Sequence, residues 1–165
     1  MKVIILCGGV GTRLKEETEF KPKPMAYVGN KPIIWHIMKI YAHFGFNEFI
    51  LALGYKADYI KEFFLNQKAF VNDFTLETSS YEANYHLNNR QEINDNFKIT
   101  FVDTGLETFV GERILICKKY VPEEDELFMV TYGDGVADVN IANLVEFHKK
   151  KGKIGTLTGV HPRSK

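Results

Sequence analysis

The stretch "VIILCGGVGTRL", residues 3–14, decides how the start of this chain folds. A short apolar, β-branched run from Lys2 to Leu6 ends directly at glycines, which is typical of a buried strand followed by a tight turn. Glycines let the backbone approach an anion closely, and consecutive N–H groups in such a turn can point into it. The stretch therefore indicates a strand that leads into an anion-binding loop.

The residues after this loop continue a regular alternation of strands and helices. Apolar, β-branched runs predict further strands at residues 48–53, 74–78, 98–103, 127–131 and 154–160. Helical spacing predicts helices that begin near Pro32, Tyr59, Gly111 and Ile141, the last capped by Asn140. The polar residues 81–96 are expected to form an exposed excursion. This order predicts an α/β fold: a Rossmann-like, mostly parallel sheet with helices on both faces.

The bulk composition excludes several classes of protein. The 165 residues suit one domain, and we treat residues 1–165 as a single domain. Lys plus Arg and Asp plus Glu both number 21, which argues against a general nucleic-acid binder. No apolar run approaches the roughly 18 residues of a membrane span, and the start has no signal-peptide layout. With Cys7 and Cys117 taken as free thiols, we expect a cytoplasmic protein that binds neither nucleic acid nor membrane.

Basic residues follow the glycine turn at short range. Arg13 offers a fixed fork of donors that suits a phosphate. Lys21 and Lys23 alternate with Pro22 and Pro24, which predicts an extended segment that fixes the direction of both side chains. The alternative is a simple strand-to-loop turn with its lysines on a solvated face. The combination of glycines, arginine and lysines favours phosphate binding.

Two common glycine motifs do not fit this loop. The dinucleotide pattern G-x-G-x-x-G fails because Leu14 stands where the third glycine is required, and no G-K-[ST] completes a P-loop. The glycines therefore indicate an anion site without naming its class.

A second candidate site lies near the carboxyl end of another predicted strand. Asp134 stands between Gly133 and Gly135, after the run at 127–131. Ligands of α/β folds bind at this edge of the sheet, and Mg²⁺ usually takes only one or two carboxylates from protein. Asp-Gly is also a common turn dipeptide, so the alternative is a structural turn. Thr104 and Arg113 have similar double interpretations: contacts to a nucleotide, or a turn and a surface arginine.

Several motifs together resemble a known family. "GGVGTRL" (8–14) and "KPKPM" (21–25) resemble the signature of sugar-phosphate nucleotidyltransferases. "GNKPIIWHIMKIY" (29–41), "VDTG" (102–105) and "YGDGVADVNI" (132–141) are most similar to the glucose-1-phosphate cytidylyltransferase branch. The resemblance covers nearly the whole chain, although 69–96 fits loosely. It departs at 110–113, where "VGER" replaces the usual T-G-G-R.

The resemblance implies a reaction and a set of site residues. The reaction is CTP plus glucose 1-phosphate to CDP-glucose plus diphosphate, Mg²⁺-dependent, on a nucleotide-diphospho-sugar transferase type of fold. Arg13 would hold the β- and γ-phosphates, Lys23 the α-phosphate, and Asp134 the Mg²⁺, with Arg13 and Lys23 catalytic. The implied nucleotide-binding residues are Leu6, Cys7, Gly8, Gly9, Val10, Gly11, Thr12, Arg13, Lys23, Thr104, Arg113 and Gly133.

The resemblance also raises a question of length. Family members continue for about another hundred residues that complete the sugar site, so we expect a domain that is incomplete at its C-terminus. An uncovered sheet edge would favour a homo-oligomer. Family members commonly serve surface-polysaccharide synthesis. The alternatives are a thymidylyl- or uridylyltransferase and a truncated nucleotide-binding module without catalysis. A dinucleotide dehydrogenase is disfavoured, because its glycine motif and ribose-binding acid are missing.

Overall fold

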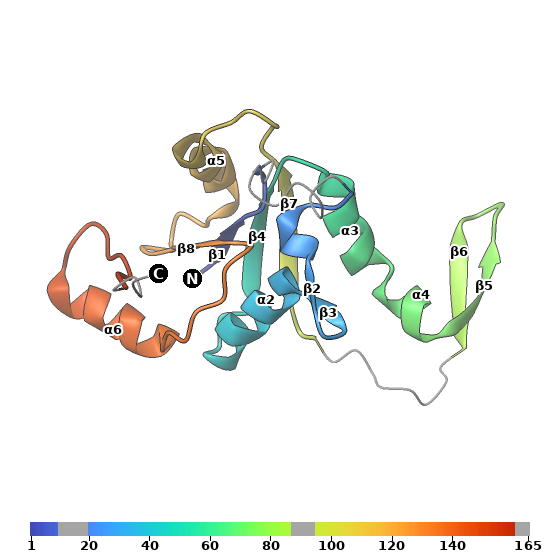
Figure 1. Cartoon of the computed structure of the whole chain (residues 1–165), viewed down its shortest axis with the longest axis horizontal. Coiled ribbons are helices and arrows are strands. Elements are labelled where there is room, and N and C mark those ends of the chain that lie inside the picture. The colour runs from blue at the N-terminus through green and yellow to red at the C-terminus, as the bar shows by residue number, and fades with distance from the viewer. Residues whose placement is uncertain (10–19, 87–94, 161–165) are drawn as a thin grey trace, which may run out of the picture.

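The central element is a sheet of four parallel strands in the order β7–β4–β1–β8 (Figure 1). The computed structural model of the chain describes residues 1–9, 20–86 and 95–160. The strands are β1 (Val3–Leu6), β4 (Glu48–Leu53), β7 (Lys98–Asp103) and β8 (Met129–Tyr132). The predicted α/β class with a parallel sheet is confirmed.

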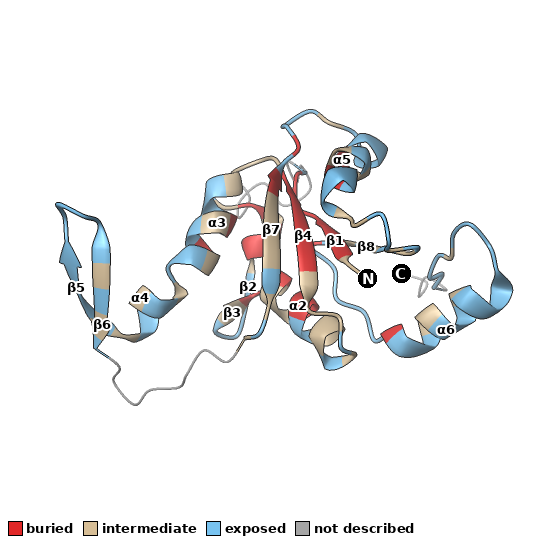
Figure 2. Ribbon diagram, turned by 180° about the vertical axis from the view of Figure 1, so that it is seen from behind, coloured by how far each residue is buried: buried red, intermediate tan, exposed pale blue. Residues whose placement is uncertain are grey.

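Helices cover both faces of this sheet, as predicted. Helices α2 (Ile33–His43) and α3 (Ala57–Leu65) pack on the face that carries Val3 and Ile5. Helix α5 (Val110–Cys117) packs on the face that carries Ile4. Figure 2 shows the buried residues gathered on β1 and β4, the two central strands. Because both faces are buried, these strands are continuous apolar runs and do not alternate with polar residues.

The order of the strands creates a switch point. The chain steps from β1 to β4 to β7 and then returns to place β8 on the other side of β1. The first two crossovers run through α2 and α3 on one face, and the return runs through α5 on the other, as right-handed connections require. The reversal lies between the carboxyl ends of β1 and β8, which is where open α/β sheets bind ligands.

Smaller elements surround the sheet. Strands β2 (Tyr27–Val28) and β3 (Lys31–Pro32) pair next to α2. Helix α4 (Gln67–Val71) leads to a hairpin of β5 (Asp73–Glu77) and β6 (Glu82–His86), which projects away from the sheet (Figure 1). Helix α6 (Ile141–Lys151) lies at the other end of the molecule. Its predicted cap is confirmed, because the Asn140 side chain accepts a hydrogen bond from the Asn143 N–H.

Two local predictions, the strand at 154–160 and the extended segment around Lys23, are wrong, and two others are refined. Residues 154–160 are exposed except for half-buried Thr156, and they pair with no described strand, so their β-branched run has no described neighbour for its backbone groups. The predicted excursion at 81–96 is exposed or half-buried in its described residues, and it also contains strand β6, whose Tyr85 pairs with Phe74 across the hairpin. The segment around Lys23 is not fully extended, since the 3₁₀ turn η1 (Lys23–Met25) begins there. The helix predicted from Gly111 ends as a separate 3₁₀ turn, η2 (Lys118–Tyr120).

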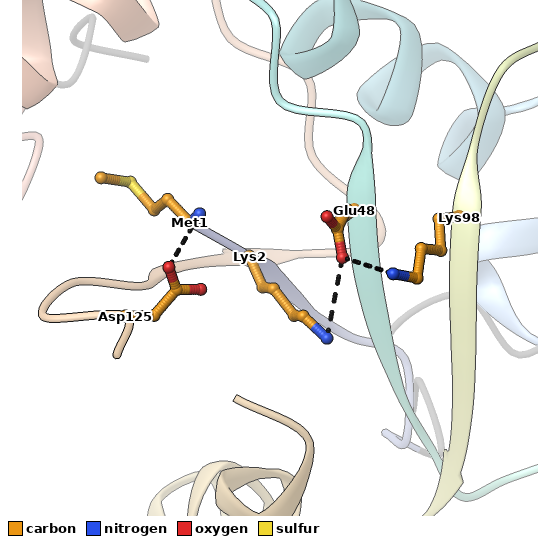
Figure 3. Close-up of polar contacts among 5 residues, drawn as sticks. All are labelled: Met1, Lys2, Glu48, Lys98 and Asp125. Atoms are coloured by element: carbon orange, nitrogen blue, oxygen red, sulfur yellow. Dashed lines mark ion pairs between the residues drawn. The ribbon is translucent and has the colours of Figure 1, made fainter. Parts of the chain in front are cut away.

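Ion pairs tie together the amino ends of three strands (Figure 3). Glu48 Oε2 lies 3.7 Å from Lys2 Nζ and 3.3 Å from Lys98 Nζ, so one carboxylate links β4 to both neighbours. The Met1 ammonium group lies 3.1 Å from Asp125 Oδ1. These charges lie at the edge opposite the glycine turn. Among the described residues, no helix has the length and apolar character needed to cross a bilayer.

Candidate functional site

A cleft of about 390 Å³ opens at the carboxyl edge of the sheet. It reaches from the β8 end of the edge to the segment between β7 and α5. It gathers seven of the predicted site residues: Leu6, Cys7, Gly8, Gly9, Lys23, Arg113 and Asp134. A larger hollow of about 900 Å³ lies between α2 and residues 136–140, but none of the predicted site residues lines it. The smaller cleft is therefore the candidate site.

The turn after β8 packs tightly against the turn after β1. The Gly133 N–H donates to the Leu6 carbonyl at 3.0 Å, which extends the pairing of β1 and β8 by one residue. A Cβ at Gly133 would lie 3.0 Å from both Cys7 Sγ and Pro24 Cγ. Glycine is required here because a side chain has no room, and the close approach fixes Asp134 beside the Lys23 turn.

Lys23 and Asp134 form an ion pair inside the cleft. Lys23 Nζ lies 3.8 Å from Asp134 Oδ2, and the two side chains are 23% and 42% exposed. The structure thus brings together the predicted phosphate ligand and the predicted metal ligand, which come from segments more than 100 residues apart in the sequence.

The donors around Asp134 fit a magnesium ion that arrives with phosphate. Mg²⁺ keeps several waters and takes one or two carboxylates plus substrate phosphates, so one half-exposed carboxylate suffices. In the described ranges no group of three or more His, Cys, Asp or Glu side chains could hold a metal alone. Asp134 is therefore suited to an ion whose remaining ligands are water and phosphate oxygens.

Arg113 is buried and holds the loop after β7. Its guanidinium donates to the Gly105 and Leu106 carbonyls at 2.7 and 3.0 Å and to the Thr104 hydroxyl at 2.6 Å. It also donates to the Gly8 carbonyl at 3.3 Å, which belongs to the glycine turn after β1. Only 5% of Arg113 is exposed. One side chain thus connects the loops that follow two different strands.

This arrangement gives Thr104 and Arg113 an observed positioning role. The buried Thr104 hydroxyl donates to the Leu53 carbonyl at 2.5 Å, and the Thr108 hydroxyl bonds the Thr104 carbonyl. Their donors are used within the protein, so both residues fix the wall of the cleft. Their predicted contacts to a nucleotide stay predictions.

Two neighbouring glycines of the first turn have different surroundings. A Cβ on Gly8 would overlap the Arg113 guanidinium, whereas a Cβ on Gly9 would meet no atom of the described residues within 4 Å. Gly54, after β4, is also closed in, because a Cβ there would lie 2.7 Å from the Gly105 carbonyl oxygen. Gly8 and Gly54 are thus required for packing, while Gly9 is exposed in the cleft and open to a ligand.

The two cysteines are buried thiols. Burial raises the pKa of Cys7, and the negative charge of Asp134 raises it further. Burial also raises the pKa of Cys117, to about 11, against a smaller opposing effect of Lys119. Because the thiolate is the nucleophile, a thiol with a raised pKa is a poor one. Cys7 therefore lines the cleft as an apolar residue and not as a covalent catalyst.

Some site residues lie outside the described residues, and others were missed. Val10, Gly11, Thr12 and Arg13 fall in the range 10–19, so their roles stay predictions. The sequence did not point to the wall made by residues 106–110, which is mostly apolar and matches no motif. Tyr132 also lines the cleft, and its place directly before the Gly133–Asp134 turn was an available signal.

Comparisons with known proteins identify the family of this chain. The family model described as nucleotidyl transferase matches residues 2–165. The chain is 48% identical, over 97% of its length, to the Bacillus subtilis (strain 168) protein named "Probable glucose-1-phosphate cytidylyltransferase". It is 45% identical, over 98% of its length, to the glucose-1-phosphate cytidylyltransferase of Salmonella typhimurium. The chain spans about 60% of the length of these curated relatives.

Solved structures give the same fold. HddC from Yersinia pseudotuberculosis, complexed with GMP-PN, has a TM-score of 0.62 at 27% identity, over 89% of this chain and 53% of that one. UDP-glucose pyrophosphorylase complexed with UDP-glucose has a TM-score of 0.63 at 17% identity, over 92% and 54%. At that identity the second likeness speaks for the fold alone.

Proposed function

The chain belongs to the nucleotidyl transferase family, and we propose that it forms the nucleotide-binding part of a glucose-1-phosphate cytidylyltransferase. The reaction joins CTP and glucose 1-phosphate to give CDP-glucose and diphosphate. The observation that carries the proposal is the meeting of Lys23, Asp134 and the glycine turn at the switch point between β1 and β8. The two cytidylyltransferase relatives support the choice of base and sugar.

The chemistry needs little covalent help from protein. A phosphate oxygen of glucose 1-phosphate attacks the α-phosphorus of CTP, the new P–O bond forms, and the bond to the leaving diphosphate breaks. Positioning and charge neutralisation lower the barrier of such a transfer. Lys23 would bind the α-phosphate, where negative charge increases in the transition state. Arg13 would bind the β- and γ-phosphates.

The backbone and Asp134 complete the nucleotide site. Exposed Gly9 leaves room for phosphate oxygens next to the backbone. Asp134 would hold Mg²⁺, and the chemistry that this ion supplies when bound is neutralisation of the triphosphate charge. Arg113 keeps the loop after β7 in place as the far wall. The proposal also includes a cytoplasmic location and a homo-oligomer. Exposed apolar side chains on β8 and α6 favour association.

Calorimetric titration tests this proposal directly. The chain is titrated with CTP, dTTP, UTP, GTP and NAD, each with Mg²⁺, and the titrations are repeated with Lys23→Ala and Asp134→Ala. We expect CTP to bind most tightly and both variants to weaken it at least about tenfold, which is the loss of one charge-assisted contact. Preference for another triphosphate would refute the assigned base. Binding of NAD alone would refute the whole assignment.

A further inference from the structure

The pairing of Lys23 with Asp134 carries a consequence for how ligands enter the cleft. Each of these residues has a role toward a different ligand in the proposed function, on which this inference rests: the lysine toward phosphate and the aspartate toward Mg²⁺. In the structure they contact each other instead, at 3.8 Å. Neither side chain can serve its own ligand fully while the pair is intact.

The pair is set by packed backbone on both sides. The Met25 N–H donates to the Pro22 carbonyl at 2.8 Å and the Ala26 N–H to the Lys23 carbonyl at 2.9 Å, so the lysine starts a closed turn. Pro22, Pro24 and Met25 are buried. The Asp134 turn has equally little freedom, because Gly133 packs against Pro24. The contact therefore follows from the fold rather than from a chance meeting of two long surface side chains.

Either ligand, binding alone, would have to break the Lys23–Asp134 ion pair. A divalent cation that binds Asp134 displaces the Lys23 ammonium and leaves two positive charges side by side. A metal-free triphosphate that binds Lys23 leaves the Asp134 carboxylate facing the phosphates. When both ligands enter together, the cation takes the carboxylate and the phosphate takes the ammonium, so neither charge is left unpaired.

We infer that the Lys23–Asp134 ion pair makes binding of the divalent cation and the triphosphate cooperative, each being weak without the other. Such coupling is reciprocal: the factor by which Mg²⁺ raises the affinity for triphosphate equals the factor by which triphosphate raises the affinity for Mg²⁺. In the ligand-free cleft the pair disfavours binding of either ligand alone, and this cost is offset only when the metal and the nucleotide bind together. This role of Lys23 adds to its proposed contact with the α-phosphate.

The inference makes an unusual prediction for metal-free nucleotide. In EDTA, Asp134→Asn should bind CTP about fivefold more tightly than wild type, because Lys23 is then free, and an ion pair of this exposure has about that weight. In the Lys23→Met background the same Asp134→Asn change should produce no gain. This double-mutant cycle separates the effect through Lys23 from simple repulsion between Asp134 and phosphate. An equal gain in both backgrounds would overturn the inference.

Glu107 provides a matched control. It lines the same cleft, so Glu107→Gln also removes one negative charge there. Simple repulsion predicts the same gain for Glu107→Gln with and without Lys23→Met. A gain of the Asp134→Asn kind that disappears together with Lys23 should be confined to position 134. If Glu107→Gln shows the same dependence on Lys23, the special role of the pair is refuted.

Titration with Mg²⁺ alone tests, without any nucleotide, whether the ion pair lowers the affinity for the cation. Lys23→Met should bind Mg²⁺ about fivefold more tightly than wild type, and the double variant Lys23→Met/Asp134→Asn should lose this binding. Equal Mg²⁺ affinity in wild type and Lys23→Met would overturn the inference. If wild type binds no triphosphate even with Mg²⁺, the proposed function fails, and the Mg²⁺ titrations still decide whether the pair restrains the aspartate.

Discussion

The sheet is held together differently at its amino edge, where the strands begin, and at its carboxyl edge, where the strands end. At the amino edge, Glu48 contacts Lys2 and Lys98, and the Glu48 and Lys98 side chains are 44% and 74% exposed. At the carboxyl edge, buried Arg113 donates to backbone carbonyls and to Thr104. Exposed ion pairs contribute little to stability, whereas buried hydrogen-bonded groups are costly to disrupt. Precise geometry is therefore concentrated at the edge that carries the candidate site.

Removal of the Arg113 guanidinium should have the largest effect. Arg113→Met keeps much of the volume but removes the buried guanidinium whose hydrogen bonds join the loop after β7 to the turn after β1, so we expect a loss of about 3 kcal/mol in the free energy of unfolding. Urea denaturation followed by circular dichroism measures it. Arg113→Lys should lose less, because an ammonium can satisfy some of the same carbonyls. A loss below about 0.5 kcal/mol for Arg113→Met would contradict the assigned role.

The next largest effect on stability is expected at the two neighbouring glycines of the first turn, which form a matched pair. Gly8→Ala should cost about 2 kcal/mol, because the new methyl group overlaps the Arg113 guanidinium. Gly9→Ala should change stability by less than about 0.5 kcal/mol, since its Cβ meets no atom of the described residues within 4 Å. Nucleotide binding should show the reverse order, with Gly9→Ala retaining a stable fold while obstructing the ligand. Equal unfolding curves for the two variants would argue against the arginine contact.

The buried thiols predict a pH dependence of stability. Burial raises the pKa of both Cys7 and Cys117, the latter from 9.0 to about 11. A pKa that is higher in the folded state contributes stability that is complete below the unfolded value and is lost as pH rises through the folded value. The free energy of unfolding should therefore fall above about pH 9, by about 1 kcal/mol per thiol at pH 10.

A double variant isolates the thiols from other groups that titrate at high pH. Cys7→Ala/Cys117→Ala should show a smaller decrease in stability between pH 8 and 10 than wild type. Urea titrations at both pH values measure the difference. If the decrease is the same in both proteins, the thiols do not remain protonated on folding as their burial requires.

The sequence predicted features that depend on neighbouring residues, and it did not predict contacts between residues far apart in the chain. The apolar runs of β1 and β4 were predicted to the residue or within one, because a strand buried on both faces leaves a continuous signal. The bounds of β7, a half-buried strand at the edge of the sheet, were also predicted to the residue. The cap at Asn140 was equally local. By contrast, the Lys23–Asp134 pair and the clamp by Arg113 join residues far apart in the sequence. Such contacts depend on strand order, which spacing does not encode.

The strand predicted at 154–160 shows that a local signal alone does not produce a strand. Ile154, Leu157 and Val160 have the residue types of a strand, yet they are exposed. Strand propensity measures the fit of a side chain to a sheet surface, and it acts only where a neighbouring strand is available. The local signal was therefore correct about residue type and wrong about structure.

The amino edge should respond least. Glu48→Gln removes the carboxylate shared by Lys2 and Lys98, and we expect a loss of about 0.5 kcal/mol because Glu48 and Lys98 are exposed, although Lys2 is only 16% exposed. This loss should shrink further in 1 M NaCl, where the Debye length is about 3 Å, whereas the loss in Arg113→Met should persist because a buried group is screened less. Urea denaturation of both variants at low and high salt makes the comparison. If Glu48→Gln costs as much as Arg113→Met, the amino edge stabilises the sheet as strongly as the carboxyl edge, and precise geometry is not confined to the candidate site.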